Sequence, residues 1–175
     1  GRLILANIYH GRKMQGVKAG EIKKLLVLEQ LPKPVNFTGT QQNLSMNGTF
    51  TLKRILGTVP VEPDGSAHFE VPALRSLYFV ALDGQGRTVK RMQSFKSVMP
   101  NETTSCVGCH EQRTRTPLNP GRSTIEALRH PPHRITPLDG IPEVFDFPRD
   151  IQPILDKHCT ACHDYDKRGG GVILS

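Results

Sequence analysis

The chain has 175 residues, enough for one domain of ordinary size or for one domain with a small appendage. Its hydrophobic content of 37% is low for a core built from side chains alone, and 16 glycines with 14 prolines favour turns over long helices. The formal charge is +7, but the basic residues are scattered and tryptophan is absent, so the composition argues against a nucleic-acid partner. The sequence also lacks an apolar run long enough to predict a membrane span.

Residues 1–98 are predicted to form an antiparallel β-sandwich-like domain, because short apolar segments are separated by glycine and proline turns. The alternating segment at 66–71 follows the turn Pro63-Asp64-Gly65, and the continuous apolar run at 77–82 is typical of a central strand. The polar segment 37–48 predicts a loop. Strands are expected at residues 3–9, 22–28, 49–61, 66–71, 77–82 and 89–95.

All four cysteines lie in two pentapeptides of the same pattern, Cys106-Val107-Gly108-Cys109-His110 and Cys159-Thr160-Ala161-Cys162-His163. Two thiols three positions apart on one helical turn can bond to the two vinyl groups of one porphyrin. The histidine that follows can then bind the iron from the same side, and this spacing is typical of c-type haem attachment. The sequence predicts two covalently bound haem c groups, with His110 and His163 as the proximal iron ligands.

Two other interpretations of the cysteine pairs are a zinc site and a pair of disulfides. Zinc ribbons usually place their two cysteine pairs about 15–20 residues apart, whereas Cys109 and Cys159 are much farther apart in the chain. Disulfides across two-residue gaps make strained loops that are more typical of redox-active sites than of structural ones. Haem attachment is preferred because a histidine follows both pairs.

Residues 99–146 are expected to carry the first haem motif and a proline-rich segment that wraps a haem. Asn101 to Thr104 are predicted to cap a short helix that bears the motif. The many prolines between residues 111 and 149 favour an extended, non-repetitive chain, and long segments of this kind are usually functional.

Residues 147–175 are expected to begin a small, α-helical cytochrome c-like domain. Ile151, Ile154 and Leu155 recur at helical spacing, with Asp150 as the predicted N-cap. The helix would lead directly into the second haem motif.

The distal ligand of each iron decides whether a haem transfers electrons or performs chemistry. Neither methionine nor histidine follows His163, so its haem must be completed from upstream, from a partner, or from sequence beyond this chain. His133, beside a stiff proline pair, and His10, at a turn after a strand, are the predicted distal ligands. A surface position is the alternative for both, and His68 is expected to be solvent-exposed.

The run from Gly57 to Ala73, followed by Ser94-Phe95 and residues 105–111, resembles the middle domain of the hydrazine synthase alpha subunit. Large exported cytochromes of planctomycete bacteria share this pattern, and residues 147–159 are similar to the first helix of the small cytochrome c domain that follows it there. The resemblance implies a preceding β-propeller and a catalytic first haem, whose motif histidine binds zinc while a tyrosine four positions later binds iron. Thr114 occupies that position here, so binding of iron by His110 is expected instead.

The expected function is that of a dihaem c-type cytochrome module, transferring electrons within or to a larger exported redox protein. The alternative is a haem enzyme related to hydrazine synthase, with one open iron acting on a small nitrogen or peroxide substrate; no catalytic residue is assigned. A zinc-stabilised binding module would instead be colourless. Because haem c is attached outside the cytoplasm, a periplasmic or otherwise exported location is expected. The partners would be a redox protein or neighbouring domains of a longer chain, with the oligomeric state undetermined.

Overall fold

The structure, a computed structural model, describes residues 1–11, 13–31, 52–92, 94–109, 114 and 125–175. These residues form two compact units, 1–141 and 142–175. The loop predicted at 37–48 and the proximal ligand predicted at His110 lie outside the described residues. The division predicted at residues 98 and 146 stays a prediction.

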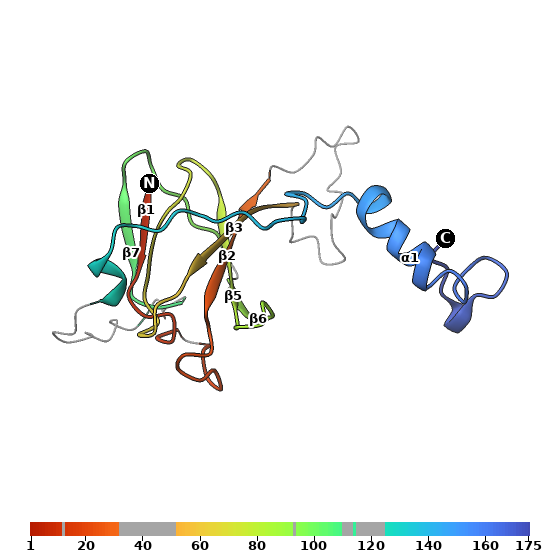
Figure 1. Cartoon of the computed structure of the whole chain (residues 1–175), viewed down its shortest axis with the longest axis horizontal. Helices are drawn as coiled ribbons and strands as arrows, with labels where there is room; N and C mark the ends of the chain where they lie inside the picture. Colours follow the sequence, from red (N-terminus) through yellow and green to blue (C-terminus); the bar gives the residue numbers. More distant parts are fainter. Residues whose placement is uncertain (12, 32–51, 93, 110–113, 115–124) are drawn as a thin grey trace. The chain divides into compact units, whose positions relative to one another are not determined.

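The described part of the first unit is built from two β-sheets, as expected for a mainly β protein (Figure 1). The three-stranded sheet has the order β4-β1-β7, and the four-stranded sheet has the order β3-β2-β5-β6. The apolar run predicted as a central strand is β5, which lies between β2 and β6. The strands are β1 (Arg2–Leu5), β2 (Lys24–Gln30), β3 (Lys53–Pro60), β4 (Ala67–Glu70), β5 (Leu77–Leu82), β6 (Thr88–Arg91) and β7 (Thr103–Cys106).

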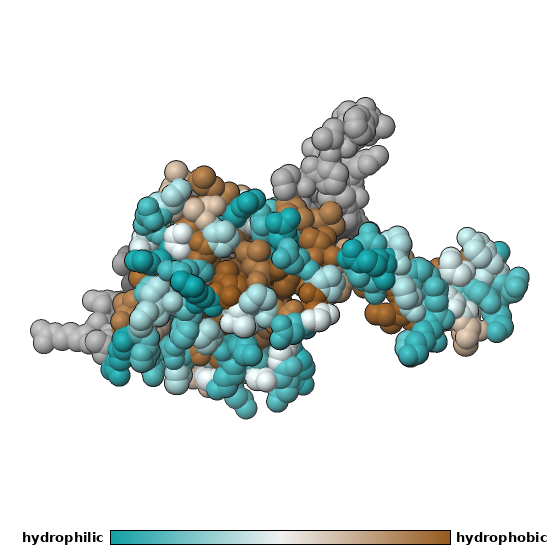
Figure 2. Space-filling model, turned by 45° about the horizontal axis from the view of Figure 1, so that its top comes forward, coloured by the Kyte–Doolittle hydropathy of each residue, from teal (hydrophilic) through white to brown (hydrophobic). Residues whose placement is uncertain are grey.

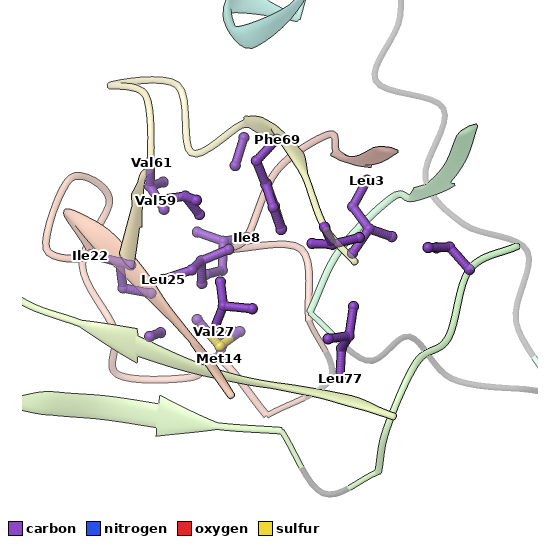
Figure 3. Packing of buried hydrophobic residues seen from close by; sticks show 14 residues of the cluster. Leu3, Ile8, Met14, Ile22, Leu25, Val27, Val59, Val61, Phe69 and Leu77 are labelled. Atoms are coloured by element: carbon purple, nitrogen blue, oxygen red, sulfur yellow. The ribbon is translucent and has the colours of Figure 1, made fainter. Parts of the chain in front are cut away.

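The hydrophobic core lies between the two sheets, because alternate residues of each strand point to the same side. Leu3 and Phe69 of the three-stranded sheet belong to the same buried cluster as Leu25, Val27 and Leu77 of the four-stranded sheet (Figure 3). The rings of Phe69 and Phe79 meet edge to face, with centroids 5.8 Å apart. This packing of one sheet on the other confirms the predicted sandwich-like architecture.

The segment before the first haem motif is a strand, so the prediction of a short helix there is wrong. β7 pairs with β1 in parallel, and Cys106 lies opposite Leu5. Thr103 and Thr104 are β-branched and suit a strand. The paired residues of the two strands lie 101 positions apart in the sequence, so no local pattern could reveal the pairing. The parallel pair also departs from the all-antiparallel sheets expected.

Residues 130–136 of the proline-rich segment are extended, as predicted, and they lie along the sandwich. His133 forms a bridge with Phe69 of β4, and Thr136 forms one with Thr58 of β3. The Thr136 amide donates to the Thr58 carbonyl over 2.9 Å, and the Thr58 amide donates back over 2.8 Å. Because β4 and β3 are the edge strands of their sheets, this segment closes one side of the sandwich.

Asp64, in the predicted turn before β4, fastens the short 3-10 helix η1 (Glu126–Arg129) to the sandwich. Its Oδ1 accepts hydrogen bonds from the amide and hydroxyl of Ser66, and its Oδ2 accepts from the Glu126 amide over 2.9 Å. The fully buried Ser66 hydroxyl accepts from the Ala127 amide over 3.0 Å. Partial burial alone would raise the pKa of Asp64, but these hydrogen bonds outweigh it and hold the pKa below its ordinary value.

We expect Asp64→Asn to lower the free energy of unfolding at pH 7 by about 1 kcal/mol, because the amide cannot replace both carboxylate acceptors. A lowered pKa stabilises the fold above the ordinary Asp pKa of about 3.9, and this contribution is lost as the pH falls through the folded-state value. The difference between the two proteins in urea unfolding should therefore shrink between pH 7 and pH 3. Asp139→Asn, on an exposed carboxylate, is the control. A difference that does not change with pH would contradict the role given to Asp64.

The second unit contains a π-helical turn η2 (Phe147–Ile151), the helix α1 (Gln152–His158) and a short 3-10 turn η3 (Gly169–Gly171). The helix α1 begins at Gln152, and its N-cap is Ile151, which makes no capping hydrogen bond through its side chain. The N-cap predicted at Asp150 is therefore wrong, and Asp146 caps the preceding turn η2 instead. The Asp146 Oδ1 accepts from the Arg149 amide over 2.9 Å, while the Asp146 amide donates to Asp150 Oδ2 over 2.7 Å. The two carboxylates thus accept hydrogen bonds from two backbone amides at the start of this turn. Within the part of the chain that the structure describes, no helix is both long and apolar enough to cross a membrane.

Candidate functional site

The second cysteine motif forms a hydrogen-bonded turn directly after α1, whose C-cap is Cys159. The Cys159 amide donates to the Leu155 carbonyl over 2.7 Å, and the His163 amide donates to the Cys159 carbonyl over 3.1 Å. Cys159 and Cys162 are therefore neighbours on one side of a helical turn, and both thiols are free. Attachment of this pair to two vinyl groups stays a prediction.

The loop that follows this turn holds His163 in place. The Gly169 amide donates to the Cys162 carbonyl over 2.8 Å, and the Leu174 amide donates to the His163 carbonyl over 2.8 Å. Gly169 lies against the imidazole, since a Cβ added there would be 3.3 Å from His163 Cε1. Nδ1 of His163 is buried and has no hydrogen-bond partner among the described residues. The ring is therefore positioned by its surroundings although one of its nitrogens is unsatisfied.

The second unit has no hydrophobic core of its own, since none of residues 142–175 is buried. The exposed fraction is 55% for Phe147, 56% for Ile154 and 65% for Tyr165. Apolar side chains left in water give up the main favourable contribution to folding. A large apolar group bound beside the cysteines would cover such side chains, so the unit fits a porphyrin.

The first cysteine motif begins on an edge strand and continues into bends rather than a helical turn. The Ala6 amide donates to the Cys106 carbonyl over 2.9 Å, which holds the end of β7 against β1. Beyond it, Gly108 packs so closely on His10 that a Cβ at Gly108 would overlap the His10 carbonyl oxygen. A Cβ at Gly11 would likewise overlap the carbonyl oxygen of Cys109. The chain after β1 and the first motif thus share one tightly packed corner.

The two predicted distal ligands lie in different places. The backbone of His10 contacts the first motif at Gly108, so this histidine is brought to the predicted site. His133 bridges to β4, and β1 lies between β4 and the strand β7 that ends at the first motif. The Nε2 atom of His133 is 3.4 Å from Glu62 Oε1. A distal role stays a prediction for both. His68, expected to be exposed, is half-buried, and its Nδ1 is buried without a hydrogen-bond partner in the described chain.

Sequence reasoning missed an apolar pocket of about 300 Å³ beside the first motif. It lies between the sheets and is lined by Leu5 and Phe69 from one sheet and by Phe79 from the other. Cys106 and Cys109 both line it. Burial raises the pKa of the Cys109 thiol, and the neighbouring Cys106 raises it further, so Cys109 remains a neutral thiol at pH 7. Only the meeting of the two sheets reveals the pocket, although the alternation of Leu3 and Leu5 in β1 is a partial signal.

Metal binding by protein side chains alone has little support in the described residues. None of their His, Cys, Asp and Glu side chains form a group of three or more that could hold a metal ion. Attachment of a c-type haem needs only two thiols for the vinyl groups and one imidazole for the iron. The second motif supplies all three groups on one turn. The residues at this motif therefore fit a covalently attached haem.

The fold and these motifs define a class of protein. Its members have a two-sheet β domain with a Cys-x-x-Cys-His motif, and a helical unit with a second Cys-x-x-Cys-His motif follows in the chain. The family model of the hydrazine synthase alpha subunit middle domain matches residues 20–111, more than half of the chain. The chain belongs to this family. This match confirms the resemblance to the middle domain, while a cytochrome c domain in residues 147–175 stays a proposal.

Two relatives from Kuenenia stuttgartiensis are similar to this chain. Hydrazine synthase subunit alpha is 24% identical over 231 residues, which cover 95% of this chain and 29% of that protein. The solved structure of the Kuenenia stuttgartiensis hydrazine synthase has a TM-score of 0.74 at 21% identity and covers all of this chain, but 30% of the solved one. The structural likeness supports the fold, and this chain spans less than a third of the length of these relatives.

Proposed function

We propose that the chain is a dihaem c-type cytochrome module that transfers electrons within, or to, a larger exported redox protein. In this proposal Cys106 and Cys109 hold one haem c, while Cys159 and Cys162 hold the other. His110 and His163 are the proximal iron ligands in this proposal, and His10 and His133 are the distal ligands. When bound, each haem supplies a one-electron iron couple.

The observation that carries the proposal is the second motif, where two free thiols and a positioned imidazole share one helical turn in a unit without buried residues. A unit of this size without a core needs an additional source of burial, such as a metal or a prosthetic group. The exposed Cys162 leaves one thiol open to a reacting vinyl group. The same turn carries His163, whose imidazole lies against Gly169.

The residues of the first unit have a complementary role. Leu3, Phe69 and Phe79 line the pocket next to Cys106 and Cys109, and they would exclude water from one part of a haem attached there. Exclusion of water lowers the local dielectric and thereby affects the potential of a redox centre. Because haem c is attached outside the cytoplasm, the proposal includes a periplasmic or otherwise exported location. Its electron partners would be a redox protein or other domains of a longer chain.

The test is the haem content and spin state of protein produced in an export-competent host that attaches haem c. We expect two haems per chain by pyridine haemochrome assay and low-spin signals in low-temperature EPR. The reduced protein should pass electrons to a small cytochrome c in stopped-flow measurements. A colourless protein, or one whose mass equals that of the bare polypeptide, would rule out the proposal.

A second candidate is a haem enzyme related to hydrazine synthase, and membership of its alpha-subunit family favours it. The pocket beside Cys106 and Cys109 gives it a place for a small substrate. This candidate requires one high-spin iron that binds carbon monoxide, cyanide or nitric oxide rapidly. If both irons are low-spin and inert toward these ligands, electron transfer is the function that remains.

A further inference from the structure

The surface of the pocket beside the first motif is almost entirely apolar, and two lysines are among the residues that line it. Leucine, isoleucine, phenylalanine, alanine and methionine side chains make up most of the lining. The charged residues among the lining are Lys90 and Lys96, with Ser94 between them in sequence. A ligand that fits this lining has a broad apolar body and carries negative charge at one end.

Neither lysine has an acidic partner among the described residues. Among the described residues of the first unit, no ion pair involves Lys90 or Lys96. Both residues are half-buried and belong to the lining of the pocket. As cations without an acidic partner, they are suited to pair with an anionic group of a ligand bound there.

The lysines and the cysteines come from opposite sheets. Cys106 ends β7, an edge strand of the three-stranded sheet. Lys90 lies in β6, an edge strand of the four-stranded sheet, and Lys96 bridges to Leu77 of β5. Packed sheets lie about 10 Å apart, so these two groups face the pocket from opposite walls. On the face drawn in Figure 2, hydrophobic side chains gather in the middle of the first unit with hydrophilic ones around them.

A haem has the polarity that this pocket requires. Its vinyl groups, which form the thioether bonds, lie on one side of the macrocycle, and its two propionates lie on the other. A ring tethered at Cys106 and Cys109 that extends across the pocket would bring its carboxylates toward β6. We propose that Lys90 and Lys96 bind the two propionates of this haem. The inference rests on the proposed function, since it requires a haem at the first motif.

The experiment measures the reduction potential of the first haem alone, in the full chain carrying Cys159→Ala and Cys162→Ala. In that background, Lys90→Gln with Lys96→Gln removes both positive charges, and we expect a lower potential because the reduced iron loses electrostatic stabilisation. The potential should also depend more steeply on salt, because added cations would then screen unpaired propionates. Lys24→Gln, on an exposed lysine outside the pocket, is the matched control and should change neither.

The outcomes separate this inference from the function on which it rests. Absence of haem from Cys106 and Cys109 in the protein with native lysines would overturn the proposed function itself. A haem that is present, with the same potential in the double Gln variant as in the control, would overturn only the lysine assignment. If the Gln variant fails to retain haem, the variant with Lys90→Arg and Lys96→Arg tests whether retention requires positive charge at these two positions. Retention by the Arg variant supports a requirement for charge, and loss from both variants contradicts it.

Discussion

Replacing Cys159 and Cys162 together with alanine is expected to remove one haem and leave the other. In the proposed function each pair of thioether bonds belongs to a separate motif, and the two motifs lie in different units of the chain. The intact mass should fall by one haem relative to the unmodified protein, and the pyridine haemochrome assay should give half the haem per chain. Cys106→Ala with Cys109→Ala is the matched variant and should lose the other haem.

The two cysteine variants should differ in what happens to the polypeptide. The first unit has a core of its own, which includes Val27 and Leu77 at 0% exposure, so it should stay folded without its haem. The second unit has no buried residue, so it should become sensitive to protease when Cys159 and Cys162 are replaced. Limited proteolysis that cuts residues 142–175 equally in both variants would contradict a structural role for the second haem.

Gly57→Ala is expected to lower the free energy of unfolding by about 3 kcal/mol or more. Gly57 lies in β3 with a φ of 133°, a conformation that residues with a Cβ rarely adopt. An added Cβ would overlap the Thr136 carbonyl oxygen and lie 2.8 Å from Ile135 Cγ2. The substitution therefore combines backbone strain with displacement of the segment that closes one side of the sandwich. Urea unfolding monitored by circular dichroism measures the change.

Gly84→Ala is the control for this prediction. Gly84 lies in the turn before β6, and an added Cβ there would meet Lys23 Cγ at 3.9 Å, an ordinary van der Waals contact. We expect its free energy of unfolding to differ from that of the unmodified protein by less than about 1 kcal/mol. Equal effects of the two substitutions would show that residues 133–136 do not pack on β3 as described.

The strands of the sandwich could be predicted because their signals are local. Ala67 and Phe69 alternate with polar residues, and Leu77 begins a continuous apolar run, so burial and strand formation agree in both segments. β7 lacked such a signal. The segment from Thr103 to Cys106 is short, polar and mostly exposed, and it forms a strand because β1 offers an unpaired edge. The cap of η2 at Asp146 was missed because Asp146 and Asp150 are equally good caps by residue type.

The sequence alone predicts the chemistry proposed for the two motifs, because the ability of two thiols and an imidazole to hold a porphyrin depends on residue type and spacing within five positions. For the second motif that spacing also determines the local structure, since a single helical turn needs no distant partner. Only the tertiary structure decided the surroundings of the first motif. The pocket at Cys106 and Cys109, with Lys90 and Lys96 on its far wall, exists because two sheets from distant segments meet there. Side-chain burial between sheets depends on the packing of the whole unit, so it cannot be predicted from any short segment of the sequence.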